Sequence, residues 1–421
     1  MPTRAPLRLD RRRFLALGAG SLAAIGAAPL AAGAQCRADT GPWIPSDEFL
    51  AALPRLMAAF AVPGLGIAVI EGGKPVWSRT LGVTHALTQA PVTAETLFEN
   101  ASLSKPVFAY LVLQLSDQGL IDLDRPLVQY RRPDYLSDSP WVALITARDV
   151  LRHSSGLPNW RTRPAQQTLT PAFKPGTRIG YSGEAFFWLQ LVVETLTGES
   201  LDESMQARLF GPAGMTASSY GWDAALAARS VYGHRAHDRP GTGMPRQLLR
   251  EQWSAAQPVA ERWSKPLSAW KYNDAVRALP DVLASAPPGL VQWQGDIMAN
   301  AAASLRTTLR DYATFMTLMM PRTTRAAWEI RETTRQAMLT PQLVLPGRWT
   351  DKGLGWNLED TRSGPVFYHA GSNADILKNF ALGDAARQRA IVLLTNGGSG
   401  NLLYRRIVRH ASGHDLLGFD L

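Results

Sequence analysis

Strand-like runs occur near both ends of this chain, whereas the residues between them are mostly spaced like helices. Two runs flank a Gly-containing turn near the start, and two more flank a turn near the end, so each pair predicts a β-hairpin. The hairpins span residues 64–81 and 376–395, and helical spacing covers residues 46–60, 103–118, 184–197, 201–209, 308–320 and 402–410. The sequence therefore predicts an α/β (α+β) fold. One antiparallel sheet is built from the N- and C-terminal segments and flanked by helices, with a mostly helical subdomain inserted at roughly residues 110–300.

The stretch 236–298 stands apart because it is rich in Pro and Trp and shows little periodicity. Long irregular segments are uncommon inside compact domains unless they have a function. Two interpretations fit this stretch: an ordered excursion over the sheet, such as a lid, or a surface insertion.

The first 34 residues have the three parts of an export signal: a basic start, an Ala/Gly-rich apolar middle and a small-x-small end. The order Arg-Arg-x-Phe-Leu at residues 11–15 resembles the twin-arginine signal. A membrane anchor over residues 14–34 is the alternative, but few Leu or Ile make its insertion energy weak. We therefore expect cleavage after Ala34 and no stable membrane span. The mature domain, residues 35–421, should then lie outside the cytoplasm, in the periplasm where the cell has one.

The formal net charge of +9 would suit a nucleic-acid partner if it were concentrated in the mature domain. Five arginines and one aspartate lie in the predicted signal, and the rest of the chain has no Lys/Arg-rich run. We therefore expect no nucleic-acid partner. The single cysteine, Cys36, excludes an intrachain disulfide and a multi-thiolate metal site. The residues before it are a poor lipidation signal.

The first chemical motif is Ser102-Leu103-Ser104-Lys105, where a polar stretch enters an apolar helical segment. The (i, i+3) spacing puts the side chains of Ser102 and Lys105 on one helix face, one turn apart. A serine hydroxyl is a poor nucleophile until a neighbour takes its proton, and a desolvated neutral lysine can do so. The motif therefore predicts a serine nucleophile, although a serine at a helix start is commonly only a cap.

Two further positions gain meaning only if the fold brings them to Ser102. Tyr181 follows a Gly-rich turn, and beside Lys105 its pKa would fall from about 10 towards the working pH. The run His369-Ala370-Gly371-Ser372 is strand-like, and a glycine in a strand indicates a bulge or a ligand close to the backbone. Taken alone, Tyr181 is more often a packing residue, and a histidine in such a run is more often buried and hydrogen-bonded.

Together and in this order, the three motifs resemble those of the S-x-x-K acyltransferases, the serine β-lactamase and penicillin-binding-protein family. Class C β-lactamases, DD-carboxypeptidases, carboxylesterases and D-amino-acid amidases are members. The stretches 151–158, 175–177, 301–311 and 353–356 also resemble family sequences, so the likeness covers roughly residues 46–415.

That resemblance implies an acyl-enzyme on Ser102, with Lys105 and Tyr181 as the acid–base pair. It further implies an oxyanion hole made by the backbone N–H groups of Ser102 and Ser372. Substrate contacts would lie at His369 and Gly371, and no cofactor or metal is needed.

Two positions depart from the family pattern. Where β-lactamases and penicillin-binding enzymes typically have Tyr-Ser-Asn, this chain has Gly183 and lacks the carboxamide. Where they commonly have Lys-Thr-Gly, it has His369, which would titrate near neutrality. We therefore expect a small-molecule ester, amide or β-lactam-like substrate with a preference for carboxylesters. Hydrolysis of β-lactams or of D-amino-acid peptides and amides is the alternative.

Two other function classes fit parts of the sequence. His234-x-x-His237 would suit a metallohydrolase, but no convincing third ligand accompanies it. The missing carboxamide at position 183 also suits a non-catalytic binding protein on a hydrolase fold. Covalent labelling of Ser102 by a fluorophosphonate or a β-lactam would distinguish the predicted enzyme from both.

Overall fold

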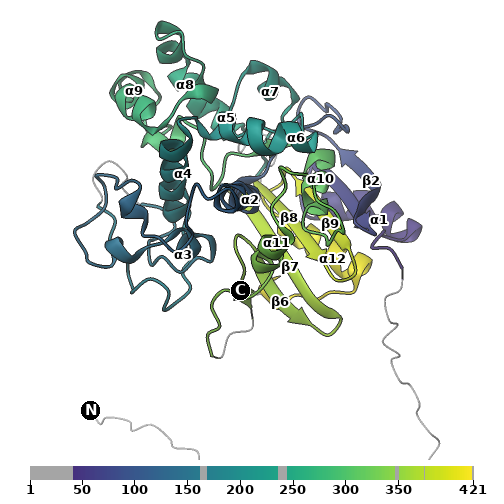
Figure 1. Cartoon of the computed structure of the whole chain (residues 1–421). Helices are drawn as coiled ribbons and strands as arrows, with labels where there is room; N and C mark the ends of the chain where they lie inside the picture. The colour runs from purple at the N-terminus through teal and green to yellow at the C-terminus, as the bar shows by residue number, and fades with distance from the viewer. Residues whose placement is uncertain (1–40, 162–167, 236–243, 347–349, 374, 420–421) are drawn as a thin grey trace, which may run out of the picture. The chain divides into compact units, whose positions relative to one another are not determined.

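The computed structural model describes residues 41–161, 168–235, 244–346, 350–373 and 375–419. Helix α1, Asp47–Ala59, begins after Ser46, whose hydroxyl accepts a hydrogen bond from the backbone N–H of Phe49 at 3.3 Å. It leads into strands β1, Gly64–Glu71, and β2, Lys74–Gly82, which pair as an antiparallel hairpin (Figure 1). The helix and the first hairpin that the sequence predicted are confirmed.

The main sheet brings the two ends of the chain together. Its strand order is β2-β1-β9-β8-β7-β6-β5, and all neighbours are antiparallel. Leu65 of β1 lies opposite Thr395 of β9, which joins the N-terminal to the C-terminal hairpin. The other strands are β5, Asp351–Lys352; β6, Asn357–Thr361; β7, Gly364–Asn373; β8, Leu377–Asp384; and β9, Arg389–Thr395. The predicted antiparallel sheet from both termini is therefore confirmed.

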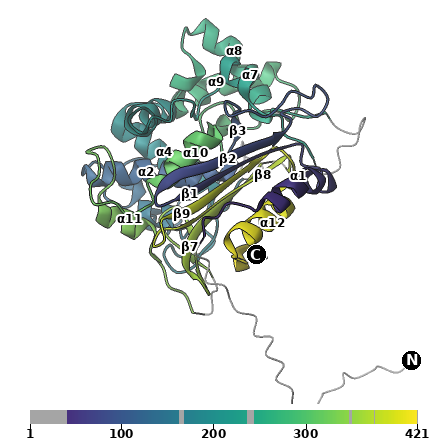
Figure 2. The same cartoon turned by 90° about the vertical axis from the view of Figure 1, so that its right-hand side faces the viewer.

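Helices cover both faces of this sheet (Figure 2). Helices α1 and α12, Gly400–Ser412, lie on one face, where Leu53, Ile67 and Leu403 share a buried apolar cluster. Helices α2, Ser104–Asp117, and α10, Leu309–Thr317, lie on the other face. Because both faces are covered, β1 and β9 are buried along nearly their whole length and read as continuous apolar runs. Within the described ranges, no helix is both long enough and apolar enough to span a bilayer.

A mostly helical region is inserted between two short strands, β3, Phe98–Glu99, and β4, Arg306–Thr307. These strands pair with each other and form a separate small sheet. Besides α2, the helices of this region are α3, Ala147–Leu151; α4, Gly183–Thr197; α5, Leu201–Met205; α6, Gly211–Ala213; α7, Ala224–Arg229; α8, Leu248–Arg262; and α9, Tyr272–Ser285. The helix predicted over residues 201–209 is α5 followed by a π-helical turn, Gln206–Phe210.

The Pro- and Trp-rich stretch is more regular than its sequence suggested. Its described part contains α8 and α9, which pack against each other. Each helix contains an internal proline, Pro258 or Pro280, and these prolines obscured the helical spacing. The described part of this stretch is therefore ordered and helical, in agreement with the predicted helical insertion at roughly residues 110–300. Both views place α8 and α9 with the other inserted helices, so this part extends the helical region and is not a lid over the sheet (Figures 1 and 2).

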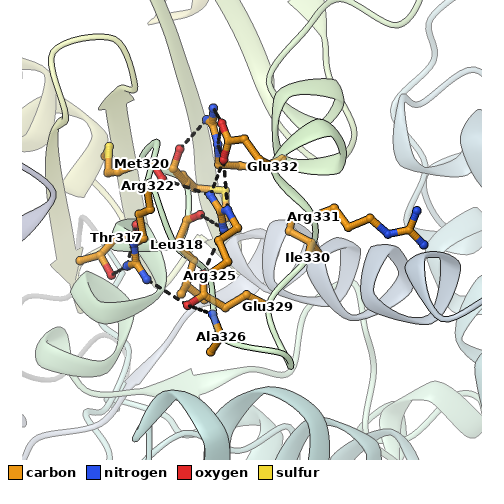
Figure 3. Close-up of polar contacts among 12 residues, drawn as sticks. Thr317, Leu318, Met320, Arg322, Arg325, Ala326, Glu329, Ile330, Arg331 and Glu332 are labelled. Carbon is orange, nitrogen blue, oxygen red and sulfur yellow. Dashed lines mark hydrogen bonds and ion pairs between the residues drawn. The ribbon is translucent and has the colours of Figure 1, made fainter.

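A cluster of ion pairs stabilises the segment that connects α10 to the next helix, α11, which spans Glu332–Met338 (Figure 3). Arg325 lies 3.0 Å from both Glu329 and Glu332, and Arg322 lies 3.1 Å from Glu329. Arg322 also donates to the hydroxyl of Thr317 at the end of α10, at 2.8 Å. The side chains of Arg325 and Glu329 are only 9% and 5% exposed, so removing either would leave a poorly compensated buried charge. The cluster therefore fixes α11, from which the chain continues towards β5.

Candidate active site

Ser102 lies in a short 3₁₀ turn, η1, Ala101–Leu103, between β3 and α2. Ala101 has a φ of 46°, in the left-handed region that is unfavourable for a residue with a Cβ atom. The carbonyl oxygen of Ala101 accepts a hydrogen bond from Ser104 Oγ at 2.5 Å. Ser104 Oγ in turn accepts a hydrogen bond from the Leu305 N–H at 3.0 Å. These bonds hold the turn in its strained conformation. Ser102 is therefore presented at a fixed position, half-buried at the wall of a cavity.

Lys105 lies one helical turn beyond Ser102 and is 1% exposed. Its Nζ is 3.1 Å from Ser102 Oγ and 2.9 Å from the carbonyl oxygen of Ala302. Lys105 Nζ lies 4.7 Å from the centroid of the Tyr181 ring and 5.7 Å from that of the Phe186 ring. Burial in these surroundings lowers the pKa of Lys105 to about 7. A substantial fraction of Lys105 is therefore neutral near pH 7, as a base acting on Ser102 requires.

Tyr181 approaches Ser102 from the start of α4. Its ring stacks on that of His153 with a centroid distance of 4.3 Å, and its hydroxyl lies close enough to Ser102 to interact with it. Burial raises the pKa of Tyr181 well above its ordinary value, and the interaction with Ser102 opposes this only in part. The expectation that Lys105 would lower this pKa is wrong, because desolvation of the phenolate dominates. Tyr181 is therefore a protonated phenol at any working pH.

His369 lies on β7 and is 3% exposed. Its Nδ1 is 2.7 Å from the carbonyl oxygen of Ala370. Burial, assisted by the nearby charge of Lys105, lowers the pKa of His369 to about 3. The expectation that His369 titrates near neutrality is therefore wrong, because the protonated ring would lose its hydration beside another cation.

Gly371 and Ser372 follow on the same strand. A Cβ atom on Gly371 would lie 2.3 Å from the carbonyl oxygen of Asn100, so only glycine lets β7 pass this close to the turn that carries Ser102. The group that lies close to β7 at this glycine is therefore the backbone of Asn100. Ser372 lines the same cavity as Ser102, and its Oγ accepts a hydrogen bond from Lys378 at 2.6 Å. The role of its backbone N–H in an oxyanion hole stays a prediction.

The fold thus places Ser102, Lys105, Tyr181 and the β7 run around one site. The cavity has a volume of about 590 Å³, and its lining also includes Asn159 and Lys352, which the sequence analysis did not single out. Asn159 directly follows one family-like stretch, and Lys352 directly precedes another. Their position beside those stretches was the only available signal, because the contacts that bring them to Ser102 are long-range.

The histidine pair proposed for a metal lies elsewhere. His234 is buried, its Nε2 accepts a hydrogen bond from the Ala86 N–H at 3.0 Å, and its Nδ1 lies 3.1 Å from the Asn396 carbonyl oxygen. His237 is outside the described residues. No group of three or more His, Cys, Asp or Glu side chains in the described part of the chain could hold a metal ion. Both ring nitrogens of His234 therefore serve to tie backbone segments together.

Comparison with known proteins gives a consistent result. The family model described as Beta-lactamase matches residues 49–411. The chain is 29% identical over 186 residues to Penicillin-binding protein 4 of Amycolatopsis lactamdurans, covering 41% of this chain and 49% of that protein. It is 27% identical over 188 residues to the Beta-lactamase of Escherichia coli, covering 42% of this chain and 49% of that protein. The matches thus span about half the length of these curated relatives.

The fold is also similar to a solved structure, that of D-alanine carboxypeptidase AmpC from Burkholderia cenocepacia. The TM-score is 0.63 at 20% sequence identity, and the match covers 86% of this chain and 99% of that chain.

Proposed function

This chain belongs to the Beta-lactamase family, and we propose that it is an exported hydrolase that forms its acyl-enzyme on Ser102 and prefers carboxylesters. The protein is a serine hydrolase related to β-lactamases and penicillin-binding proteins. The observation that carries the proposal is the pair formed by Ser102 and Lys105. The lysine Nζ is 3.1 Å from the serine oxygen, and its pKa is lowered to about 7.

Acylation begins when Ser102 Oγ attacks the substrate carbonyl carbon and its proton passes to neutral Lys105. The oxyanion is stabilised by the start of α2 and, as we propose, by the backbone N–H groups of Ser102 and Ser372. Tyr181, whose hydroxyl lies close to Ser102, donates its phenolic proton to the leaving oxygen and is reprotonated by Lys105.

Deacylation reverses these roles. Water attacks the acyl carbon and gives a proton to the Lys105/Tyr181 pair, which returns one to Ser102 Oγ as the ester bond breaks. Each proton taken up is thus released, and the enzyme regains its starting state.

The preference for esters rests on Gly183 and His369. Gly183 offers no carboxamide to a substrate amide, and His369 is neutral at working pH because its pKa is about 3. A short acyl ester needs neither an amide-binding group nor a cation at these positions. The names of two relatives, the Beta-lactamase of Escherichia coli and the D-aminopeptidase of Gluconobacter oxydans, favour the alternative, hydrolysis of β-lactams or of D-amino-acid peptides.

A substrate screen tests the proposal. Purified mature protein should hydrolyse p-nitrophenyl acetate measurably and nitrocefin slowly or not at all, with D-amino-acid amides as the third arm. A fluorophosphonate should add covalently to Ser102 in intact-protein mass spectra, and Ser102→Ala should abolish both labelling and turnover. Faster hydrolysis of nitrocefin than of the acetate ester would contradict the ester preference and indicate a β-lactamase. Absence of both the adduct and turnover would support a non-catalytic binding protein.

A further inference from the structure

The stretch 151–158 takes part in no step of the proposed mechanism, although it lies against Tyr181. His153 follows the C-cap of α3 and has a φ of 58°, in the left-handed region where a helix usually ends with glycine or asparagine. Its side chain is only 3% exposed. A strained backbone persists only where the surrounding contacts maintain it, and such residues concentrate at functional sites. The contacts of His153 therefore indicate its role.

His153 is bonded to the residues on both sides of Tyr181. Its carbonyl oxygen accepts a hydrogen bond from the Gly180 N–H at 2.8 Å, and its Nδ1 accepts one from the Ser182 N–H at 3.2 Å. Between these two bonds the imidazole stacks on the phenol ring, with centroids 4.3 Å apart and an interplanar angle of 30°. One residue thus contacts the Tyr181 segment at its backbone on either side and at the face of its ring.

His153 is itself held by the end of α3. The N–H of Ser154 donates to the carbonyl oxygen of Asp149 at 2.7 Å, and the Ser154 hydroxyl donates to the Asp149 carboxylate at 2.8 Å. The same carboxylate forms an ion pair with Arg152 at 2.8 Å, and its side chain is 7% exposed. These bonds enclose the backbone of His153 and maintain its left-handed conformation. The imidazole therefore offers Tyr181 a rigid support.

The imidazole of His153 is neutral. Burial lowers its pKa well below the ordinary value, because the cation would lose its hydration. Nδ1 must be unprotonated to accept from the Ser182 N–H, so the ring proton is on Nε2. Nε2 is buried and has no hydrogen-bond partner among the described residues. The contacts that reach the Tyr181 segment are therefore the ring face, Nδ1 and the backbone carbonyl.

We propose that His153 is a positioning residue that directs the Tyr181 hydroxyl towards the leaving-group oxygen. It exchanges no proton itself and acts only through Tyr181. The inference rests on the proposed function, since it concerns the proton donor of the same Ser102 site.

The basicity of the leaving group gives a specific measure of this role. Phenolate is more basic than p-nitrophenolate, so phenyl acetate depends more on protonation of its leaving oxygen than p-nitrophenyl acetate does. A misplaced phenol hydroxyl should therefore slow the phenyl ester more. A general loss of folded protein would slow both esters equally.

Two substitutions separate the side-chain contacts of His153. His153→Asn removes the stacked ring but keeps an acceptor as many bonds from the backbone as Nδ1, and asparagine tolerates the left-handed conformation. His153→Phe keeps a ring and removes the acceptor. A small misplacement of a catalytic group is costly, so His153→Asn should lower kcat/KM for phenyl acetate about tenfold or more, and lower that for p-nitrophenyl acetate less. His153→Phe should recover part of this loss if stacking is the main contact, and none of it if Nδ1 is.

His234→Asn is the matched control, because His234 is also 3% exposed but its ring bonds to Ala86 and Asn396 instead of the Tyr181 segment. This variant should lower the melting temperature and leave the ratio of kcat/KM for the two esters unchanged.

A double-mutant cycle with Tyr181→Phe tests whether His153 acts through the Tyr181 hydroxyl. Where that hydroxyl is absent, His153→Asn should change kcat/KM for phenyl acetate less than about twofold, so the two substitutions are not additive. Equal losses in both backgrounds, equal losses for both esters, or full activity of His153→Asn and His153→Phe would overturn the proposal. Fluorophosphonate labelling of Ser102 in the wild-type protein and in these variants would show that the proposed function stands independently of that result.

Discussion

Lys105 and Tyr181 lie beside Ser102 in the same desolvated surroundings, yet burial moves their pKa values in opposite directions. The charged form of lysine is the cation, so burial lowers its pKa to about 7. The charged form of tyrosine is the anion, so burial raises its pKa. This difference assigns the two residues distinct roles in the free enzyme: Lys105 is the group that can accept the serine proton, and Tyr181 is a donor.

Replacing Tyr181 by Phe tests the donor role. We expect Tyr181→Phe to reduce turnover of p-nitrophenyl acetate by at least about 10²-fold, as loss of a positioned acid–base group typically does. The fold should persist, since one hydroxyl is removed and the ring can still stack on His153. Circular dichroism and steady-state kinetics on the same preparation measure both. Near-normal turnover in a folded variant would mean that Tyr181 only packs in the site and is not the proton donor.

The pH dependence of kcat/KM for a neutral ester tests Lys105 as the base. Lys105 must be neutral to accept a proton, so kcat/KM should rise with pH up to about 7, roughly tenfold per unit at the acid end, and level off above it. His369, with a pKa of about 3, stays neutral from pH 5 to 9 and should add no inflection in that range. His369→Asn is the control variant and should keep the same profile. A profile that is flat between pH 5 and 8 would exclude Lys105 as the base.

At the scale of elements, the site depends on the contact between β7 and the turn η1. Gly371 is the residue that permits it, because an added Cβ atom would meet the Asn100 carbonyl oxygen at 2.3 Å. That oxygen belongs to the backbone of a strained turn, so it has little freedom to move. The absence of a Cβ atom at Gly371 therefore determines how close Ser372 lies to Ser102.

Gly371→Ala should separate the two elements and disable the site. We expect at least about 10²-fold loss of kcat/KM, the usual effect of removing one oxyanion donor, together with some loss of stability. Gly66→Ala is the matched control, because it is also a strand glycine but the nearest atom to its Cβ would belong to the side chain of Leu309, at 3.3 Å. That control should lower the melting temperature without a comparable loss of turnover. If Gly371→Ala retains full activity, the close approach of β7 is unnecessary for catalysis.

The elements themselves were largely predictable, whereas the chemistry inside the site was not. Apolar strand-like runs with turns between them located both hairpins, and helical spacing located α1, α2, α4, α5, α10 and α12, because burial of these elements is visible in the order of apolar residues. The other described helices were not predicted. Pro258 and Pro280 removed that trace from α8 and α9. The pKa shifts of Tyr181 and His369 were predicted with the wrong sign or size, because spacing gives proximity but not the extent of desolvation. Asn159 and Lys352 reach the cavity through long-range packing, which no local pattern encodes.

For the molecule as a whole, export is a proposal that rests on residues 1–34, which lie outside the described residues. The order Arg11-Arg12-x-Phe-Leu motivates it. We expect the double substitution Arg11→Lys and Arg12→Lys to strand the precursor in the cytoplasm, measured by cell fractionation and by the mass of the mature N-terminus. The same double change at Arg4 and Arg8 keeps the charge, lies outside the motif, and should leave export intact. Normal processing of the Arg11/Arg12 variant would exclude the twin-arginine route.

The buried base also affects the stability of the whole molecule. The pKa of Lys105 is about 7 in the folded protein against 10.5 for an ordinary lysine, so the unfolded chain binds more protons between these pH values. Stability contributed by this group is therefore fully present above pH 10.5 and is lost as the pH falls towards 7. Lys105→Met removes the buried amine and should inactivate the enzyme. It should also raise the free energy of unfolding at pH 7 by on the order of 1–3 kcal/mol, since each unit of pKa shift corresponds to about 1.4 kcal/mol.

Melting temperatures of Lys105→Met and the wild-type protein between pH 7 and pH 10 provide the measurement. Their difference should be largest at pH 7 and shrink as the pH rises, because the wild-type protein regains the stability linked to Lys105. Lys74→Met, which alters an exposed lysine on β2, should show no such convergence. A difference that is independent of pH would mean that Lys105 is charged in the folded protein over this range, and the lysine could then not serve as the resting base for Ser102.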